Sequence, residues 1–139
     1  MTGRCDRVFV DAPCSGSGTW RRRPEAAWRL TPETLKRLEG LQRQIARRAA
    51  DLVAPGGRLI YATCSLFQGE NQAVAADLQS GRPELRPLPI CEALAEAAIG
   101  EEARIRLAAL AGDGHTLQLT PRRAGTDGFF IALFRRDAG

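Results

Sequence analysis

Two of the four cysteines in this 139-residue chain follow short apolar runs, and a cysteine thiolate can act as a nucleophile. Cys14 stands in a Pro- and Gly-rich stretch after residues 7–10, and Cys64 comes directly after residues 58–63. Both runs favour β-strands, and the residues that follow them belong to loops. A single free cysteine is more often a small buried core residue. Two cysteines in equivalent loops, one flanked by Pro and Gly and the other by Thr and Ser, favour a functional role over core packing.

The segment between the two runs predicts the helix that would place these loops side by side. Its apolar residues recur at helical spacing, with Thr31 as the N-cap, and we expect residues 55–57 (Pro-Gly-Gly) to terminate the helix. Strand, helix and strand form a right-handed unit with parallel strands, so both loops leave the same edge of the sheet. Neighbouring strands lie about 4.8 Å apart. Cys14, Cys64 and Asp11 are then expected to share one cleft.

The rest of the chain continues the same α/β pattern. We expect a second helix from Gly69 to about Leu78, and irregular chain through Pro83, Pro87 and Pro89. A further helix is predicted over residues 92–111. Two final strands are predicted at residues 116–121 and 129–134, joined by a turn over residues 122–128.

The composition is that of one ordinary globular domain, with 44% hydrophobic and 26% charged residues. Apolar stretches are far shorter than the about 20 residues that span a membrane. Neither these stretches nor the N-terminus indicates a membrane or secreted protein, so we expect a cytoplasmic one. The cysteines include no C-x-x-C pair, which argues against a metal site. The net charge of +4 is carried almost entirely by arginine, which fits a polyanionic partner but is also typical of a GC-rich genome.

Four segments together resemble, in order and spacing, the motifs of the Sun-type (Nop-Sun) RNA cytosine-5 methyltransferases. The resemblance covers nearly the whole chain. It implies an α/β fold that is the C-terminal half of a Rossmann-like class I methyltransferase sheet, with parallel strands, a final antiparallel strand and helices on the faces. The segments are Asp-Ala-Pro-Cys-Ser-Gly-Ser-Gly-Thr at 11–19 with Arg21–Arg23, Pro24 and Trp28, then Tyr-Ala-Thr-Cys-Ser-Leu at 61–66 with Glu70 and Asn71, and Thr-Asp-Gly-Phe-Phe-Ile-Ala at 126–132.

The resemblance also implies roles for individual residues. Cys64 would be the nucleophile that adds to carbon 6 of cytosine, so that carbon 5 can attack the methyl group of S-adenosyl-L-methionine. Cys14 is implied in the release of the methylated base. Asp11 would contact the cytosine edge and the cofactor, and Pro13 and Arg22 would bind the substrate. The implied partner is RNA, either rRNA or tRNA.

The arginine run and the two tryptophans have two interpretations each, whereas we assign a single role to the histidine and to the phenylalanine pair. Arg21–Arg23 could supply the positive charge that a thiolate needs, or could be a solvated surface run. Trp20 and Trp28 could stack a base or anchor the loop. We interpret His115, the only histidine, as structural, and Phe129–Phe130 as core packing.

The chain lacks the Gly-rich strand-turn-helix and the following acidic residue with which such a methyltransferase begins. We therefore expect residues 1–139 to be a partial catalytic domain without its N-terminal cofactor-binding half. The chain would be a fragment, or a short protein completed by a second polypeptide, and alone it would not bind S-adenosylmethionine. A cysteine hydrolase or thiol-redox protein is disfavoured by the single histidine and the missing C-x-x-C. A non-catalytic RNA-binding or interaction module with the family fold is the stronger alternative.

Overall fold

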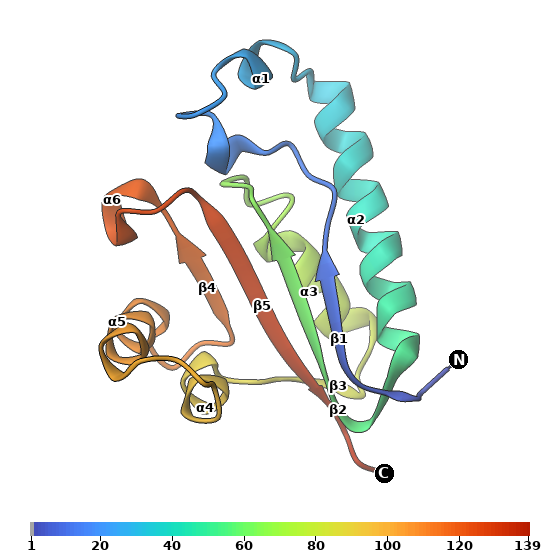
Figure 1. Ribbon diagram of the computed structural model, residues 1–139. Coiled ribbons are helices and arrows are strands. Elements are labelled where there is room, and N and C mark those ends of the chain that lie inside the picture. Colours follow the sequence, from blue (N-terminus) through green and yellow to red (C-terminus); the bar gives the residue numbers. More distant parts are fainter. Residues whose placement is uncertain (1) are drawn as a thin grey trace.

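The computed structural model describes residues 2–139, and its centre is the predicted strand-helix-strand unit (Figure 1). Strand β1 (Cys5–Asp11) leads through a loop to helix α2 (Pro32–Leu52), and α2 leads directly into β2 (Val53–Thr63). The two strands are parallel neighbours. Both therefore end at the same edge of the sheet, as the sequence predicts.

The other elements complete a five-stranded mixed sheet of order β1-β2-β5-β3, in which β4 also pairs with β5. The final strand, β5, is antiparallel to β2, β3 and β4, which confirms the predicted α/β class and its antiparallel last strand. These elements are η1 (Ser17–Thr19), α1 (Glu25–Trp28), α3 (Gln72–Gly81), β3 (Leu85–Pro87), α4 (Ile90–Ala95), α5 (Glu101–Ala111), β4 (Thr116–Leu119), α6 (Pro121–Ala124) and β5 (Phe129–Arg136).

Helix α2 begins where the sequence predicts. The hydroxyl oxygen of Thr31 accepts a hydrogen bond from the backbone N–H of Thr34 at 3.1 Å, and Pro32 occupies the first turn. The face of α2 that meets the sheet is built from small residues, among them the buried Ala46 and Ala50. Small side chains let the helix lie close to β1 and β2, so the loop that precedes α2 is held near the strand ends.

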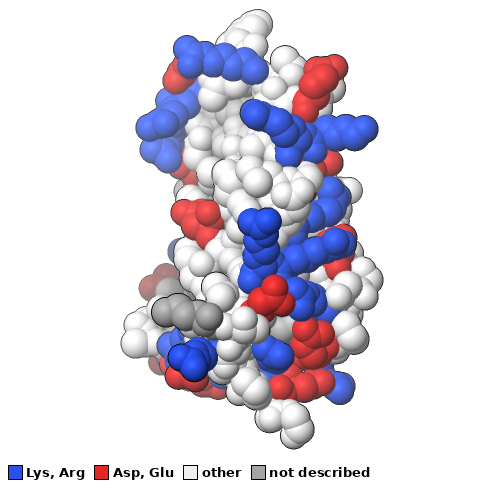
Figure 2. Space-filling view, turned by 90° about the vertical axis from the view of Figure 1, so that its right-hand side faces the viewer, with Lys and Arg blue, Asp and Glu red and all other residues white. Residues whose placement is uncertain are grey.

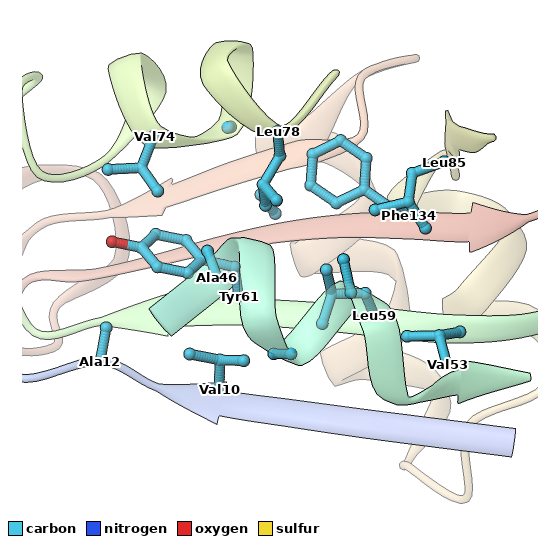
Figure 3. Close-up of a cluster of buried hydrophobic side chains, with 14 of the residues drawn as sticks. Val10, Ala12, Ala46, Val53, Leu59, Tyr61, Val74, Leu78, Leu85 and Phe134 are labelled. Atoms are coloured by element: carbon cyan, nitrogen blue, oxygen red, sulfur yellow. The ribbon is translucent and has the colours of Figure 1, made fainter. Parts of the chain in front are cut away.

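The alternation of side chains along the strands gives the sheet two apolar faces. On one face Leu59, Tyr61 and Phe134 pack beneath α2 and α3, as Figure 3 shows. On the other face Ile60 and Leu133 pack against α4 and α5. Helices thus cover both faces, as the class predicts.

Several predicted boundaries are wrong. Helix α2 ends at Leu52, and residues 55–57 do not terminate it; they form an irregularity within β2, where the pairing with β1 shifts register. The second helix starts at Gln72 because residues 69–71 form a turn. Residues 92–111 contain the end of α4 and all of α5, and a short helix, α6, occupies part of the predicted turn at 122–128. Strand β3 falls in the proline-rich stretch that was expected to be irregular.

Strand β1 lies at the edge of the sheet and pairs with β2 alone among the described strands. The side chain of Phe9, which pairs in register with Ile60, is 66% exposed. In residues 2–139 no helix is long and apolar enough to cross a membrane.

Candidate active site

The loops after β1 and β2 bring the two predicted cysteines into contact. The Sγ atoms of Cys14 and Cys64 are 3.3 Å apart, and both side chains are half-buried. Backbone hydrogen bonds join the loops on either side: Ala12 N–H donates to Ala62 O, and Gly18 N–H donates to Cys64 O, both at 2.9 Å. The prediction that two cysteines distant in sequence lie together is confirmed.

The surroundings of Cys14 keep its thiol protonated. Burial raises the pKa of Cys14 to about 12, and the adjacent Cys64 acts in the same direction. The backbone N–H of Gly16 lowers the pKa, but burial outweighs it. At neutral pH Cys14 is therefore a neutral S–H group that can donate a hydrogen bond to the sulfur of Cys64.

A buried carboxylate holds the two cysteine loops together. Glu70 is fully buried, and its carboxylate accepts hydrogen bonds from the backbone N–H of Ser15 at 2.8 Å and from the Ser15 hydroxyl at 2.6 Å. It also accepts from Gln42 Nε2 at 3.0 Å and from the hydroxyl of Ser65. Ser15 follows Cys14 and Ser65 follows Cys64, so one side chain fixes the positions of both neighbours. A buried carboxyl group is stable only when hydrogen-bond donors of this kind satisfy its oxygen atoms.

Further buried hydrogen bonds surround the same centre. The hydroxyl of Ser17 accepts from Leu66 N–H at 2.8 Å and contacts the Ser65 hydroxyl at 3.1 Å. The amide of Asn71 accepts from the Thr63 hydroxyl at 2.5 Å and donates to Ser65 O at 2.8 Å. The sequence singles out Glu70 and Asn71 only as part of a motif and assigns neither a role. A signal was available, because Glu70 and Asn71 are adjacent polar residues directly before helix α3, six and seven positions after Cys64.

A third loop closes on the loop that carries Cys14. Gly128 N–H donates to Gly18 O at 2.9 Å, and the two glycines touch so closely that a Cβ on Gly18 would lie 2.2 Å from Gly128 O. Next to this contact Arg22 Nε donates to Asp127 at 2.6 Å, and Arg21 lies 3.8 Å from the same carboxylate. The guanidinium groups of Arg21 and Arg22 thus pair with Asp127 and tie the loops together. A role of Arg21–Arg23 as the positive charge beside the thiolate stays a prediction.

Two other predicted site residues, Asp11 and Pro13, border the cysteines, and their side chains take no part in this network. The side chains of Asp11 and Pro13 are exposed at the end of β1. Within residues 2–139 the carboxylate of Asp11 has no hydrogen bond or ion pair, while the carbonyl of Pro13 accepts from Gln42 Nε2 at 2.9 Å. Asp11 is thus an acceptor open to a ligand at the edge of the sheet where such folds bind ligands.

Some of the aromatic residues and the histidine pack inside the chain, and others are exposed to solvent. Trp20 packs edge-on against Phe67 with ring centroids 5.8 Å apart, and so anchors the loop, whereas Trp28 is 88% exposed. His115 packs against a core phenylalanine, and burial lowers its pKa, which supports a structural role. Of the two phenylalanines expected in the core, Phe130 is buried and Phe129 is 42% exposed.

The fold matches solved structures over nearly its whole length. The crystal structure of PH0851 superimposes with a TM-score of 0.79 at 33% identity, over 97% of this chain and 27% of that one. The crystal structure of NSun6 from Pyrococcus horikoshii with SFG matches with a TM-score of 0.64 at 25% identity, over 92% of this chain and 29% of that one. The fold and the site at the strand ends thus assign the chain to the class of Rossmann-like methyltransferases.

Residues 1–135 match the family described as 16S rRNA methyltransferase RsmB/F, and the chain belongs to this family. This confirms the resemblance to the Sun-type enzymes. Ribosomal RNA small subunit methyltransferase B of Thermus thermophilus is 34% identical over 96% of this chain and 30% of its own length. Methyltransferase F of Escherichia coli is 34% identical over 94% of this chain and 26% of its own length. The chain spans less than a third of the length of these curated relatives.

Proposed function

We propose that this chain is the catalytic C-terminal part of an S-adenosylmethionine-dependent rRNA cytosine-5 methyltransferase with a covalent thiolate mechanism. The observation that carries the proposal is the contact of Cys14 and Cys64 at 3.3 Å, in loops that follow two parallel strands. The family description supports rRNA as the substrate, in preference to tRNA.

In the proposed reaction Cys64 is the nucleophile. Its thiolate adds to carbon 6 of a cytosine, and the electron density displaced onto carbon 5 makes that carbon nucleophilic. When bound, S-adenosylmethionine supplies an electrophilic methyl group to carbon 5. A water molecule then takes the carbon 5 proton, the electron pair of the C5–H bond forms the C5=C6 double bond, and the electron pair of the C6–S bond leaves with Cys64 as a thiolate.

Cys14 assists at the sulfur of Cys64. Because burial keeps the pKa of Cys14 near 12, it retains its proton and donates a hydrogen bond to the Cys64 sulfur. This hydrogen bond acts in the release step: it stabilises the negative charge that develops on the Cys64 sulfur as the C6–S bond breaks. The assignment of Cys14 to the release step is thereby given a physical reason.

Asp11 is proposed to bind the ligands at the end of β1. Its unpaired, exposed carboxylate fits the exocyclic amine of cytosine or the donor groups of S-adenosylmethionine, which carries an ammonium and ribose hydroxyls. The NSun6 structure that resembles this chain contains SFG, an analogue of that cofactor. Pro13 would pack against the base beside Cys14, and Arg22 would reach a phosphate while held by Asp127.

The test traps the covalent intermediate. Cells that carry an epitope tag on the native gene are grown with 5-azacytidine, whose ring has no proton at position 5 and therefore keeps the sulfur bond after methylation. We expect a protein–RNA adduct that Cys64→Ala abolishes and that Cys14→Ala retains or increases. Cys91→Ala, at an exposed site, serves as the control and leaves the adduct unchanged. An adduct that survives Cys64→Ala would overturn the proposal.

The alternative is an RNA-binding module that keeps the family fold without catalysis. The same experiment separates the two functions, because a module co-purifies with RNA after reversible crosslinking but forms no adduct with 5-azacytidine. RNA recovery without an adduct in the wild-type protein would therefore replace the enzymatic proposal with this one.

A further inference from the structure

The positive charge of the chain is concentrated in one segment. Residues 20–50, which we call the cationic segment, hold nine of the 20 Lys and Arg and three of the 16 Asp and Glu, a net charge of +6. The remaining residues hold eleven basic and thirteen acidic side chains, a net charge of −2. The basic character of the chain, with its pI near 9.3, is therefore a property of α1, α2 and their connections.

Most of these cations are not used within the described structure. Ion pairs in residues 2–139 engage three of the nine, namely Arg21 and Arg22 with Asp127, and Arg47 with Asp77. Four of the other six lie on α2, spread over about 18 Å of helix axis at 1.5 Å per residue. Figure 2 shows that Lys and Arg outnumber acidic side chains on the face that α2 occupies. The six cations without an ion pair are Arg23, Arg29, Lys36, Arg37, Arg43 and Arg48.

An exposed tryptophan stands at the start of this surface. Trp28 ends helix α1 and is 88% exposed, in contrast to Trp20, which packs against Phe67. An indole that is 88% exposed packs little within the described chain, and a large aromatic beside arginines matches the surfaces that stack unpaired bases. In Figure 1 helix α1 lies at the same end of the sheet as the loops after β1 and β2.

We infer that α1 and the outer face of α2 bind single-stranded RNA, with a base stacked on Trp28 and phosphates on the cations of α2. The inference rests on the proposed function for the choice of RNA as partner, and it adds a docking surface outside the cysteine site. Neither feature suffices alone: a cationic helix by itself binds any polyanion, whereas an aromatic platform distinguishes a strand with free bases. The strand would run from α2 past Trp28 toward Cys14 and Cys64.

The test measures binding without catalysis. The full 139-residue chain carrying Cys64→Ala is titrated into a fluorescein-labelled, mixed-sequence single-stranded RNA of about 12 nucleotides, and anisotropy is recorded. Trp28→Ala should weaken binding about five- to a hundredfold, with an unchanged salt dependence, and Trp28→Phe should restore most of it. Because Trp28 is exposed, these variants should fold as the parent does, which circular dichroism checks.

Substitutions on α2 should act differently. The double variant Arg37→Gln/Arg48→Gln should weaken binding and reduce the slope of log affinity against log salt by about 1.4, at about 0.7 per phosphate contact. Ile105→Ala and Arg106→Gln are the matched controls, since both side chains are exposed on α5, and they should leave affinity and slope unchanged.

Three results would overturn the inference. The first is that Trp28→Ala binds RNA as tightly as its parent. The second is that the α5 control variants lose as much RNA affinity as the α1 and α2 variants. The third is that the chain binds inorganic polyphosphate as tightly as it binds RNA. The last result would reveal a general polyanion surface. A failure of the proposed function alone gives another pattern of results. In that case no 5-azacytidine adduct forms, but RNA binding still depends on Trp28. An adduct that forms with no effect of Trp28→Ala on affinity would sink this inference alone.

Discussion

Burial and the neighbouring Cys64 both raise the pKa of Cys14, and this shift can be tested by the reactivity of the thiol. Iodoacetamide reacts with thiolates, so at pH 8 we expect Cys14 to be alkylated at least about tenfold more slowly than the exposed Cys91 in the same chain. The rate at Cys14 should rise steeply only as the pH approaches about 12. Peptide mass spectrometry of time points measures both sites. Equal rates at pH 8 would contradict a protonated Cys14.

The same pKa shift predicts a pH dependence of stability. The folded pKa of Cys14, about 12, is raised above the ordinary value of 9.0, so its contribution is fully present below pH 9 and is lost as the pH rises toward 12. Cys14→Ser should therefore flatten the decline of the free energy of unfolding over this range. Urea titrations at pH 8 and pH 10.5 measure the difference.

Glu70 is the residue on which the geometry of both thiols depends. Glu70→Gln replaces an acceptor oxygen by an amide that faces donors from Ser15, Ser65 and Gln42, so we expect a loss of roughly 2–4 kcal/mol in the free energy of unfolding. Glu25→Gln, at an exposed position in α1, is the control and should change stability by less than about 0.5 kcal/mol. Denaturant unfolding measures both. A neutral result for Glu70→Gln would show that its carboxylate does not hold the loops.

The cysteines and Glu70 differ in what the sequence reveals about them. Cys14 and Cys64 follow apolar runs and punctuating Pro, Gly and Ser residues, which are local signals that place them at strand ends. The function of Glu70 depends on donors 55, 28 and 5 residues away that only the folded chain assembles. Likewise, the pairing of Arg22 with Asp127 spans 105 residues, and nothing in the local sequence predicts it.

At the scale of elements, two glycines test how the loops and helices are packed. Gly18→Ala would place a Cβ 2.2 Å from the backbone oxygen of Gly128, which cannot move without breaking the contact between their loops, so we expect a loss of at least about 2 kcal/mol. Gly40→Ala, inside α2, meets nothing within 4 Å and should stabilise the chain by about 0.5–1 kcal/mol. Thermal unfolding of the two variants measures these opposite shifts. A stabilised Gly18→Ala would show that the two loops do not meet as described.

Element boundaries were predicted best where local signals act alone. Thr31 and Pro32 mark the start of α2, because capping and proline geometry are local. The end of α2 was misplaced since residues 55–57 have the composition of a turn, yet pairing with β1 draws them into β2 as a bulge. Strand β3 was missed for a similar reason: its three residues end in Pro87 and are held by pairing with β5 at the edge of the sheet.

At the scale of the whole molecule, cofactor affinity depends on how much of the pocket residues 1–139 contain. Asp11 contributes one charged acceptor, worth about 1.5–3 kcal/mol, whereas micromolar binding requires about 8 kcal/mol. We therefore expect the chain alone to give no measurable heat with S-adenosylmethionine in titration calorimetry. Micromolar binding would contradict the prediction that the cofactor-binding half lies outside these residues.

The open edge at β1 makes a prediction about self-association. Among the described strands β1 pairs on one side only, and such an edge strand with a 66% exposed Phe9 is a template for another chain. We expect the isolated chain to associate increasingly with concentration in sedimentation velocity, and Phe9→Lys to suppress this association because a charged side chain on an edge strand opposes pairing. Ile105→Lys removes a comparably exposed apolar side chain, 62% exposed, from α5 and should have no such effect. If both variants act alike, surface hydrophobicity in general drives the association, and the edge of the sheet has no special part in it.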